Sequence, residues 1–305
     1  MFANDKNNFT LATIPYIIIK LGGRVMYKLG IIGYPLSHSI SAVIQKAGFE
    51  SLGIEGCYDV LETSPEDLIS RIKYLKTNGY NGFNVTIPLK VPMSLFLDDI
   101  DDYANIAGCV NTVKIQEDRS FIGYNTDIYG FKTAIPNDIN LHSKRASILG
   151  TGGASRAAVV GLAEKGIKNI DFYTRNIINS RQTLDYVRAK FPNIEFNVYQ
   201  IQNIRSLADS AIIVNATPIG MKGFMADQMP LEVKDFENLS GDTVVYDIVY
   251  NPIKTVLIKE AEKRGLRTII GLDMLIYQAQ RAIEIWTGKT PDFSIMKIAA
   301  LEALR

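Results

Sequence analysis

Ile148-Leu149-Gly150-Thr151-Gly152-Gly153-Ala154-Ser155-Arg156-Ala157 stands between a short apolar run typical of a strand and a periodic stretch typical of a helix. Gly150 permits a tight turn, and Gly152 and Gly153 carry no side chain that would keep a pyrophosphate from the backbone. The N–H groups that open the following helix then point at the anion. Ser155 replaces the third glycine of the general fingerprint. Similar glycine clusters also form ordinary helix-entry turns, so the surrounding elements must decide between a nucleotide site and a turn.

The surrounding elements alternate between strand and helix, which favours the nucleotide site. Apolar strands are expected at Arg145–Leu149, Asn169–Tyr173, Glu195–Tyr199, Ala211–Val214, Thr243–Ile248 and Arg267–Ile270. Helices are expected between them at Ser155–Glu164, Asn179–Lys190 and Ile253–Lys263. Six short buried strands with intervening helices predict a doubly wound, Rossmann-type parallel sheet.

The chain before this loop has its own alternating pattern, which predicts a separate α/β domain. Strands are expected at Lys28–Gly33, Gly56–Leu61, Gly82–Val85 and Cys109–Ile115. Helices are expected after a Ser37 or Ser39 cap, after Ser64 as cap with Pro65 at the first helical position, from Val91, and near Ile128–Thr133. The segment from Asp273 onward is helical in pattern and has no strand of its own, so we expect it to pack back on the first domain.

These patterns predict an N-terminal extension over residues 1–25, a first domain over 26–128 that 272–305 complete, and a nucleotide-binding domain over 129–271. The extension contains an apolar run, Leu11–Lys20, without the basic start or the cleavage pattern of a signal peptide. We therefore expect a dispensable tail, with Met26 a natural start for the folded chain.

Composition argues against several kinds of partner. The 305 residues carry a net charge of +1 without a basic run, so no nucleic-acid partner is expected. No apolar run reaches the ~20 residues that cross a bilayer, so no membrane partner is expected. Cys57 and Cys109 are interpreted as free thiols of a reducing, cytoplasmic compartment rather than as a disulfide. His38 and His142 have no neighbours at metal-ligand spacing, so no metal site is predicted.

The end of the second strand of the nucleotide domain bears on the choice of cofactor. Thr174-Arg175-Asn176 provides an arginine for a 2′-phosphate and no acid for a free ribose, which favours NADP over NAD. Asp171 lies too early, in mid-strand. Thr217-Pro218-Ile219-Gly220-Met221 is interpreted either as an ordinary turn or as a loop beside the nicotinamide.

A second polar cluster, Asn84-Val85-Thr86-Ile87-Pro88-Leu89-Lys90, ends a short strand of the first domain. Pro88 cannot donate a backbone hydrogen bond, so the chain must leave the sheet there. Lys90 is then a candidate proton donor at the rim of the sheet, or a solvated surface lysine.

Read in order, the polar motifs resemble the shikimate dehydrogenase family from about Lys28 to the C-terminus. They are Gly33–Ser39, Asn84–Lys90, Gly108–Thr112, Gly123–Asp127, Gly150–Ala154, Asn215–Met221, Tyr246–Pro252 and Gly271–Gln278. The resemblance implies NADPH-dependent reduction of 3-dehydroshikimate to shikimate in chorismate and aromatic amino-acid biosynthesis.

The resemblance also implies roles for individual residues. Lys90 and Asp127 are implied as the catalytic pair, with the lysine held charged by the carboxylate. Implied substrate-binding residues are Ser37, Ser39, Asn84, Thr86, Asn111, Asp127, Tyr250 and Gln278. Implied cofactor-binding residues are Gly150, Gly152, Gly153, Ala154, Thr174, Arg175, Asn176, Thr217, Met221, Val249 and Gly271.

Some alternatives stay open from the sequence. The family's usual Asn-Arg-Thr appears here as Thr174-Arg175-Asn176, and Asn179 stands where a second arginine is expected. Ser37 and Ser39 are interpreted as helix caps, as a carboxylate site, or as both, and Tyr250 as a pocket or a core residue. The competing functions are an NAD-dependent quinate/shikimate dehydrogenase and a non-catalytic metabolite-binding protein. A monomer or a homodimer is expected.

Overall fold

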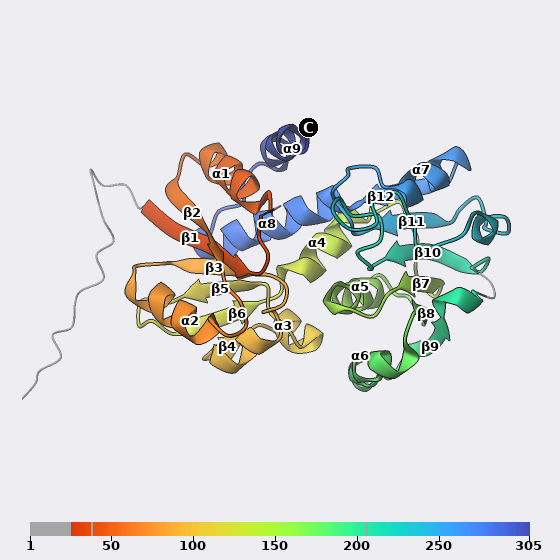
Figure 1. Ribbon diagram of the computed structural model, residues 1–305, viewed down its shortest axis with the longest axis horizontal. Helices are drawn as coiled ribbons and strands as arrows, with labels where there is room; N and C mark the ends of the chain where they lie inside the picture. The colour runs from red at the N-terminus through yellow and green to blue at the C-terminus, as the bar shows by residue number, and fades with distance from the viewer. Residues whose placement is uncertain (1–25, 38, 205–206) are drawn as a thin grey trace, which may run out of the picture.

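The computed structural model describes residues 26–37, 39–204 and 207–305, which form two lobes side by side (Figure 1). The extension predicted over residues 1–25 lies outside the described residues. Each lobe is built on one six-stranded sheet.

The first lobe contains a mixed sheet with the strand order β2-β1-β3-β5-β6-β4. Its strands are β1 (Met26–Gly33), β2 (Glu55–Glu62), β3 (Gly82–Val85), β4 (Asp99–Ile100), β5 (Thr112–Ile115) and β6 (Phe121–Tyr124). Strand β1 is parallel to β2 and β3, whereas β5 is antiparallel to β3 and β6. The central position of β3 carries the Asn84–Lys90 cluster out of the middle of this sheet.

Helices cover both faces of the first sheet. One apolar cluster joins it to α2 (Leu68–Thr77), the 3-10 turn η1 (Pro92–Phe96) and α3 (Asp102–Ala107). Another joins it to α1 (Ser41–Ser51), α8 (Gly271–Thr287) and α9 (Phe293–Ala303). The C-terminal helices therefore pack back on the first lobe, as the sequence predicts. The indole N–H of Trp286 donates to the carbonyl of Val113 in β5 at 3.0 Å.

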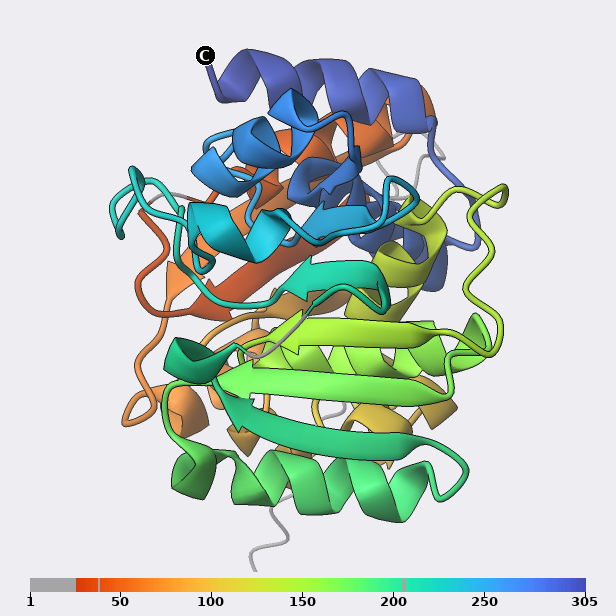
Figure 2. The same cartoon turned by 90° about the vertical axis from the view of Figure 1, so that its right-hand side faces the viewer.

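The second lobe is a doubly wound parallel sheet with the order β12-β11-β10-β7-β8-β9 (Figure 2). Its strands are β7 (Arg145–Leu149), β8 (Asn169–Thr174), β9 (Glu195–Gln200), β10 (Ser210–Asn215), β11 (Val244–Asp247) and β12 (Arg267–Ile270). The helices between them are α5 (Gly153–Glu164), α6 (Ile177–Lys190) and α7 (Val256–Lys263). The strand order reverses between β7 and β10, and ligands of such sheets bind at this point.

The central strands of the second lobe carry apolar side chains on both faces, because helices bury both faces of the sheet. Ile148 of β7 belongs to a cluster with α5 and α6, whereas the next residue, Leu149, belongs to a cluster with α7. Val214 and Ile213 of β10 divide between the two clusters in the same way. The predicted Rossmann-type sheet is confirmed.

Helix α4 (Thr126–Ala134) and helix α8 pack along one another between the two sheets (Figure 1). Phe131 of α4 stacks on Tyr246 of β11, with ring centroids 4.7 Å apart. Ile276 and Ile283 of α8 lie in the core of the first lobe. These two helices therefore form the connection between the lobes.

Several predicted element ends in the first lobe are wrong. Helix α1 has Ile40 at its N-cap, and the Ser39 hydroxyl instead accepts a bond from the Ser41 N–H. Helix α2 begins at Leu68, because Ser64–Asp67 forms a turn closed by its own side chains. Serine hydroxyls bond to nearby N–H groups in turns as readily as at helix starts.

Short elements in the first lobe also escape the sequence patterns. The helix expected from Val91 is only the turn η1, and the strand expected from Cys109 begins at Thr112. The elements α3, β4 and β6 were not anticipated. They have six, two and four residues, too few to show a period.

Candidate active site between the lobes

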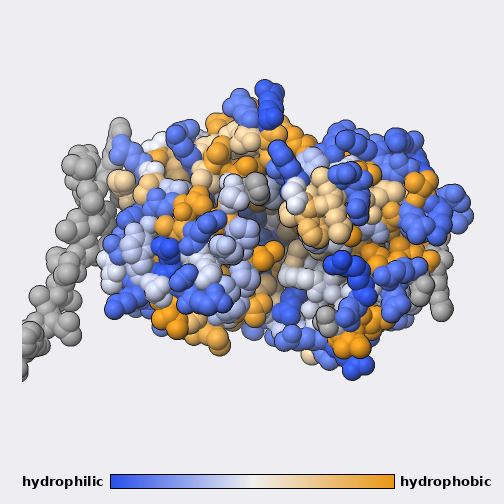
Figure 3. Space-filling model, viewed as in Figure 1, coloured by the Kyte–Doolittle hydropathy of each residue, from blue (hydrophilic) through white to orange (hydrophobic). Residues whose placement is uncertain are grey.

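A cavity of about 420 Å³ lies between the two lobes, where the space-filling surface is hollowed (Figure 3). The first lobe contributes the end of β3, Asn111 and helix α1, and the second contributes the loops after β7, β10 and β11. Helices α4 and α8 supply further lining residues. The cavity thus lies between the carboxyl end of β3 in the first sheet and the carboxyl ends of β7, β10 and β11 in the second.

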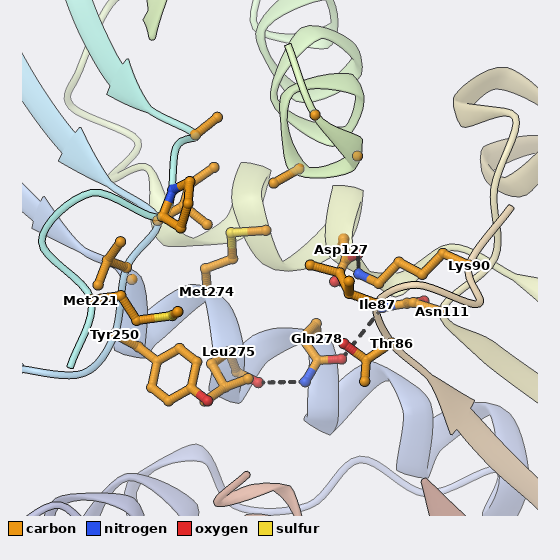
Figure 4. Close-up of a pocket in the computed structure, with 18 of the residues that line it drawn as sticks. Thr86, Ile87, Lys90, Asn111, Asp127, Met221, Tyr250, Met274, Leu275 and Gln278 are labelled. Atoms are coloured by element: carbon orange, nitrogen blue, oxygen red, sulfur yellow. Dashed lines mark hydrogen bonds and ion pairs between the residues drawn. The ribbon is translucent and has the colours of Figure 1, made fainter. Parts of the chain in front are cut away.

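Lys90 and Asp127 meet at the wall of this cavity (Figure 4). The ammonium donates to the Asp127 carboxylate at 2.5 Å, although the residues lie 37 positions apart. Asp127 stands in the first turn of α4, which the Asn125 side chain caps. Their side chains are 23% and 15% exposed, so the pair is shielded but open to the cavity.

The electrostatics of Lys90 favour its charged form. Burial by itself lowers the pKa of the ammonium, but the charge of Asp127 and its hydrogen bond raise it by more. The net result is a pKa above the ordinary lysine value. Lys90 is therefore a protonated group beside the cavity at neutral pH.

The Asp127 carboxylate is oriented by a network of amides. Asn111 donates to the other oxygen of Asp127 at 2.8 Å and to the Thr126 hydroxyl at 2.9 Å. The Thr126 N–H donates to the Asn111 amide oxygen at 2.7 Å. Gln278 of α8 donates to the carbonyl of Leu275 and accepts from the Thr126 hydroxyl at 3.3 Å. The Asp127 carboxylate is thus held by a network of residues from the segment before β5, from α4 and from α8.

Asn84 lines the cavity but already has partners for its whole amide. Its oxygen accepts from Tyr58 at 2.6 Å and Gln45 at 3.3 Å. Its nitrogen donates to Thr112 at 2.9 Å and to the carbonyl of Asn111 at 3.1 Å. The amide has two donors and two lone pairs, so all four are occupied. Thr86, two residues on, lines the same wall.

The two serines singled out in the sequence do not line this cavity. Ser37 is exposed and Ser39 half-buried, in the segment that leads into α1. Ser41, at the start of the helix, is the serine that lines the cavity.

The glycine loop after β7 has the geometry that the sequence predicts. Gly150 has a φ of +97°, and an added Cβ there would lie 2.9 Å from Thr217. A Cβ at Gly152 or Gly153 would meet nothing within 4 Å. Gly152 is the N-cap of α5 and provides no side-chain cap, so the first N–H groups of the helix face open space. This is a cradle for an anion.

Ser155 explains how the loop manages without its third glycine. Its side chain is fully buried, and its hydroxyl donates to the carbonyl of Gly152 at 2.6 Å. The serine therefore closes the turn from inside the helix and leaves the cradle free. Gly152, Gly153 and Ala154 all line the cavity, whereas Gly150 does not.

The residues at the end of β8 do not line the cavity. In the sheet, β8 lies next to β7 on the side opposite β10. Thr174 is buried and bonded to the Ser180 hydroxyl at 3.0 Å. Arg175 is exposed, and no described residue pairs with its guanidinium. Asp171 is bound by Arg145 at 2.7 Å and by Asn197 at 3.1 Å, so it is a structural strand residue.

The second-lobe wall of the cavity is made by residues after β10 and β11. It includes Thr217, Met221, Val249 and Tyr250, together with Gly271 at the start of α8. A Cβ at Gly271 would lie 2.2 Å from the carbonyl of Ile248, so only glycine permits this close approach. In Figure 4, Met221 and Tyr250 lie across the cavity from Lys90 and Asp127.

Sequence reasoning missed several lining residues, most of them apolar. They are Ile31, Ser41, Val85, Ile87, Ala216, Pro218, Ile248, Met274 and Leu275. All but Ile31 and Ser41 lie inside motifs that the sequence singled out, so proximity to those motifs was the available signal.

Other features of the described residues bear on partners. Cys57 and Cys109 are both free thiols. Among residues 26–37, 39–204 and 207–305, no group of three or more His, Cys, Asp and Glu side chains could hold a metal ion. Within the same ranges, no helix has the length and apolar character needed to cross a membrane.

An anion cradle on a doubly wound sheet, facing a shielded Lys–Asp pair across one cavity, defines a two-domain dehydrogenase that binds a dinucleotide. Family comparisons specify which one. The shikimate dehydrogenase substrate binding domain matches residues 31–113, and the shikimate 5'-dehydrogenase C-terminal domain matches residues 271–301.

Individual relatives agree with the family match. A shikimate dehydrogenase (NADP(+)) of Archaeoglobus fulgidus is 38% identical over 280 residues, covering 92% of this chain and 100% of the relative. The chain belongs to the shikimate dehydrogenase family.

Two solved structures are close in fold. Shikimate 5-dehydrogenase of Thermus thermophilus, in complex with NADP(H) and shikimate, has a TM-score of 0.78 at 32% identity, covering 92% of this chain and all of that one. Quinate dehydrogenase of Corynebacterium glutamicum, in complex with NAD, has a TM-score of 0.84 at 28% identity, covering 91% and 99%.

Proposed function

We propose that this protein is an NADP-dependent shikimate dehydrogenase, which reduces 3-dehydroshikimate to shikimate in chorismate and aromatic amino-acid biosynthesis. The observation that carries the proposal is the Lys90–Asp127 pair facing the glycine loop across one cavity. The identity to NADP-dependent relatives supports the choice of substrate and cofactor.

The residues present fit a dinucleotide. Gly152 and Gly153 leave space where a pyrophosphate would approach, and the uncapped start of α5 offers N–H donors to it. Thr174, Arg175 and Asn176, at the end of β8, would hold the adenosine half, with the free guanidinium on the 2′-phosphate. Thr217, Met221, Val249 and Gly271 would line the nicotinamide half. When bound, the cofactor supplies the hydride.

Lys90 would complete the reduction. Converting a ketone to an alcohol adds a hydride to the carbon and a proton to the oxygen, and negative charge develops on that oxygen. A lysine whose pKa is raised by Asp127 remains protonated and can neutralise this charge. In the oxidising direction Lys90 must first lose its proton, so oxidation of shikimate is favoured at alkaline pH.

The first lobe would bind the substrate. Polar side chains that line the cavity would hydrogen-bond to the hydroxyls of the substrate. They are Thr86, Asn111, Asp127, Gln278 and Tyr250. Asn84 would act mainly by orienting its neighbours, since its amide is already bonded. Ser37 and Ser39 remain proposed carboxylate ligands beside Ser41.

We also infer the division of labour along the chain. Residues 26–128, completed by 272–305, form the substrate-binding domain, and residues 129–271 form the NADP-binding domain. A cytoplasmic location, a monomer or homodimer, and the absence of a nucleic-acid partner remain predictions from the sequence.

A matrix of activities tests the function. Shikimate and quinate are each assayed with NADP⁺ and NAD⁺ by absorbance of the reduced nicotinamide. The proposal expects the highest kcat/KM for shikimate with NADP⁺. Preference for quinate with NAD⁺ would instead indicate the activity of the Corynebacterium relative, and shikimate binding without turnover would indicate a non-catalytic protein.

A further inference from the structure

Asp247 is a fully buried carboxylate that neither the glycine loop nor the Lys90–Asp127 pair explains. It is the last residue of β11 and pairs in register with Asn215, the last residue of β10. None of the described lysines or arginines forms an ion pair with it. A buried charge without a cation is costly, so its presence here calls for another reason.

Three donors surround this carboxylate. One oxygen accepts from the Asn215 amide at 2.9 Å and from the Val249 N–H at 3.0 Å. The other accepts from the Thr255 hydroxyl at 2.5 Å. Burial raises the pKa of Asp247 and these hydrogen bonds offset part of the rise, which leaves the pKa at about 6. The group is therefore ionised at neutral pH in a site that contains only donors.

Asn215 extends the network into the loop after β10. Its amide nitrogen also donates to the carbonyl of Ile219 at 3.2 Å. Its oxygen accepts from both the N–H and the hydroxyl of Thr217, at 3.0 and 2.7 Å. The Thr217 hydroxyl in turn accepts from the Ile219 N–H at 3.2 Å. The Asn215 side chain therefore stabilises the conformation of this loop through bonds to Thr217 and Ile219.

The two segments that Asp247 joins are both walls of the cavity. Thr217 and Met221 come from the loop after β10, and Val249 and Tyr250 from the segment after β11. The carboxylate bonds the second segment directly and the first through Asn215. A backbone bond from the Lys222 N–H to the carbonyl of Asn251 at 2.7 Å also joins the chain just beyond the two segments.

The strand order places the nicotinamide half of a dinucleotide against this wall. The pyrophosphate cradle follows β7, and Arg175 follows β8 on one side of it. The adenosine half therefore lies toward β8, and the other half lies over β10 and β11.

We propose that Asp247 is a positioning residue, which acts through Asn215 and the Val249 N–H to hold the loops 216–221 and 248–250 against the nicotinamide half of the bound cofactor. This inference rests on the proposed function.

The test combines cofactor binding with amide hydrogen exchange in Asp247→Ala, Asp247→Asn and the wild type. The Thr217 and Val249 amides report directly, because each donates to a side chain of the network. In Asp247→Ala we expect at least tenfold faster exchange at both amides. We also expect at least tenfold weaker NADP⁺ binding by calorimetry.

The asparagine variant should restore function. Its oxygen can still accept from Asn215 and Val249, and its nitrogen can donate to the Thr255 hydroxyl. We expect NADP⁺ binding within about threefold of the wild type. Should Asp247→Ala fail to fold, Asn215→Ala separates the branches: exchange should rise at Thr217 but not at Val249, with weaker NADP⁺ binding.

Asp171→Ala is the matched control, since Asp171 is a buried strand carboxylate of the same sheet outside the cavity. It should lower Tm and leave NADP⁺ binding unchanged. If Asp247→Ala, or Asn215→Ala in its place, behaves like this control, Asp247 is only structural and the inference is overturned. A wild type that binds NADP⁺ but does not oxidise shikimate refutes the proposed function and leaves the binding test intact.

Discussion

Lys90 shows how much the function of one residue depends on its surroundings. A lysine after a strand end is usually a solvated charge. Here the ammonium is shielded, bonded to Asp127 and directed at a cavity that the nucleotide loop also lines. The same side chain is therefore placed to protonate an oxygen inside the cavity.

Replacing Lys90 by alanine should lower kcat for ketone reduction by roughly 10²- to 10⁴-fold, the usual contribution of a general acid. KM should change only a few-fold, because the interaction forms mainly in the transition state. Lys46→Ala, at a 76% exposed lysine, is the control and should have no effect. A kcat within a few-fold of the wild type would make Lys90 a binding residue only.

Asp127→Asn should move the pH profile of ketone reduction to lower pH. The carboxylate raises the Lys90 pKa against the effect of burial, so its loss lowers that pKa. Reduction needs protonated Lys90 and is lost as pH rises through this pKa, so the variant should lose activity at a lower pH. The pair also contributes to the stability of the folded protein. That contribution is complete below lysine's ordinary pKa of about 10.4 and is lost as pH rises through the raised pKa of the folded state. Profiles that coincide from acid to alkaline pH would show that the pair is not coupled to catalysis.

Arg175 should determine the preference between cofactors. Arg175→Ala should lower kcat/KM for NADP⁺ about tenfold, or about 1.4 kcal/mol, and leave that for NAD⁺ unchanged. Arg267→Ala is a suitable control. This arginine is the first residue of β12, the strand at one edge of the sheet, and it pairs with Asp138 away from β8. An equal loss of kcat/KM with both cofactors would mean that Arg175 contacts a group that NADP⁺ and NAD⁺ have in common.

At the scale of elements, the start of α5 is more informative than any single side chain. Its N–H groups lack a side-chain cap, and two glycines leave the space before them open. Helices α1, α2 and α8 also lack a side-chain cap, so the open space before α5 is what distinguishes its start. We propose that this space admits an anion.

Gly153→Ala tests that interpretation. The added methyl meets no protein atom, and alanine is a better helix former than glycine, so Tm should stay the same or rise. NADP⁺ affinity should nevertheless fall roughly tenfold, or about 1.4 kcal/mol, because the methyl occupies the approach to the backbone. Gly241→Ala, in an exposed turn with equally open space, controls for the methyl itself. Unchanged NADP⁺ affinity in Gly153→Ala would mean that the pyrophosphate does not bind at the start of α5.

The elements of the second lobe were predictable because most of its strands are short, largely apolar runs between turns, with few polar residues such as Asp171. The strands at Arg145–Leu149 and Arg267–Ile270 match their predicted bounds. The first lobe was harder because its mixed sheet uses short strands such as Phe121–Tyr124, whose four residues show no clear period. Serines near α1 and α2 also indicated caps where the structure has turns.

At the scale of the whole molecule, the C-terminal helices return to the first lobe and carry cavity residues with them. Helix α8 supplies Gly271, Met274 and Gln278 to the cavity, and α9 packs against α1 and α8. The site therefore depends on packing between segments that are more than 200 residues apart in sequence.

Met296→Ala measures that packing. Met296 of α9 is fully buried in the cluster that joins α1 and α8, so the variant should lose about 2–5 kcal/mol in the free energy of unfolding by urea. Ile298→Ala, on the same helix but 57% exposed, should lose less than about 0.5 kcal/mol. Equal losses would mean that α9 contributes by helix propensity rather than by packing.

The sequence by itself determined the second sheet, its glycine loop and the polar ends of its strands, because strand period, turn chemistry and helix entry are local properties of the chain. The proposed roles of Lys90 and Asp127 came from the order of motifs, since their pairing is not a local property. Only the tertiary structure brought this pair within 2.5 Å and placed Ser41 at the cavity. It likewise joined Asp247 to the segment after β11 directly and to the loop after β10 through Asn215. Contacts of this kind depend on how sheets and helices pack, and no short stretch of sequence contains that information.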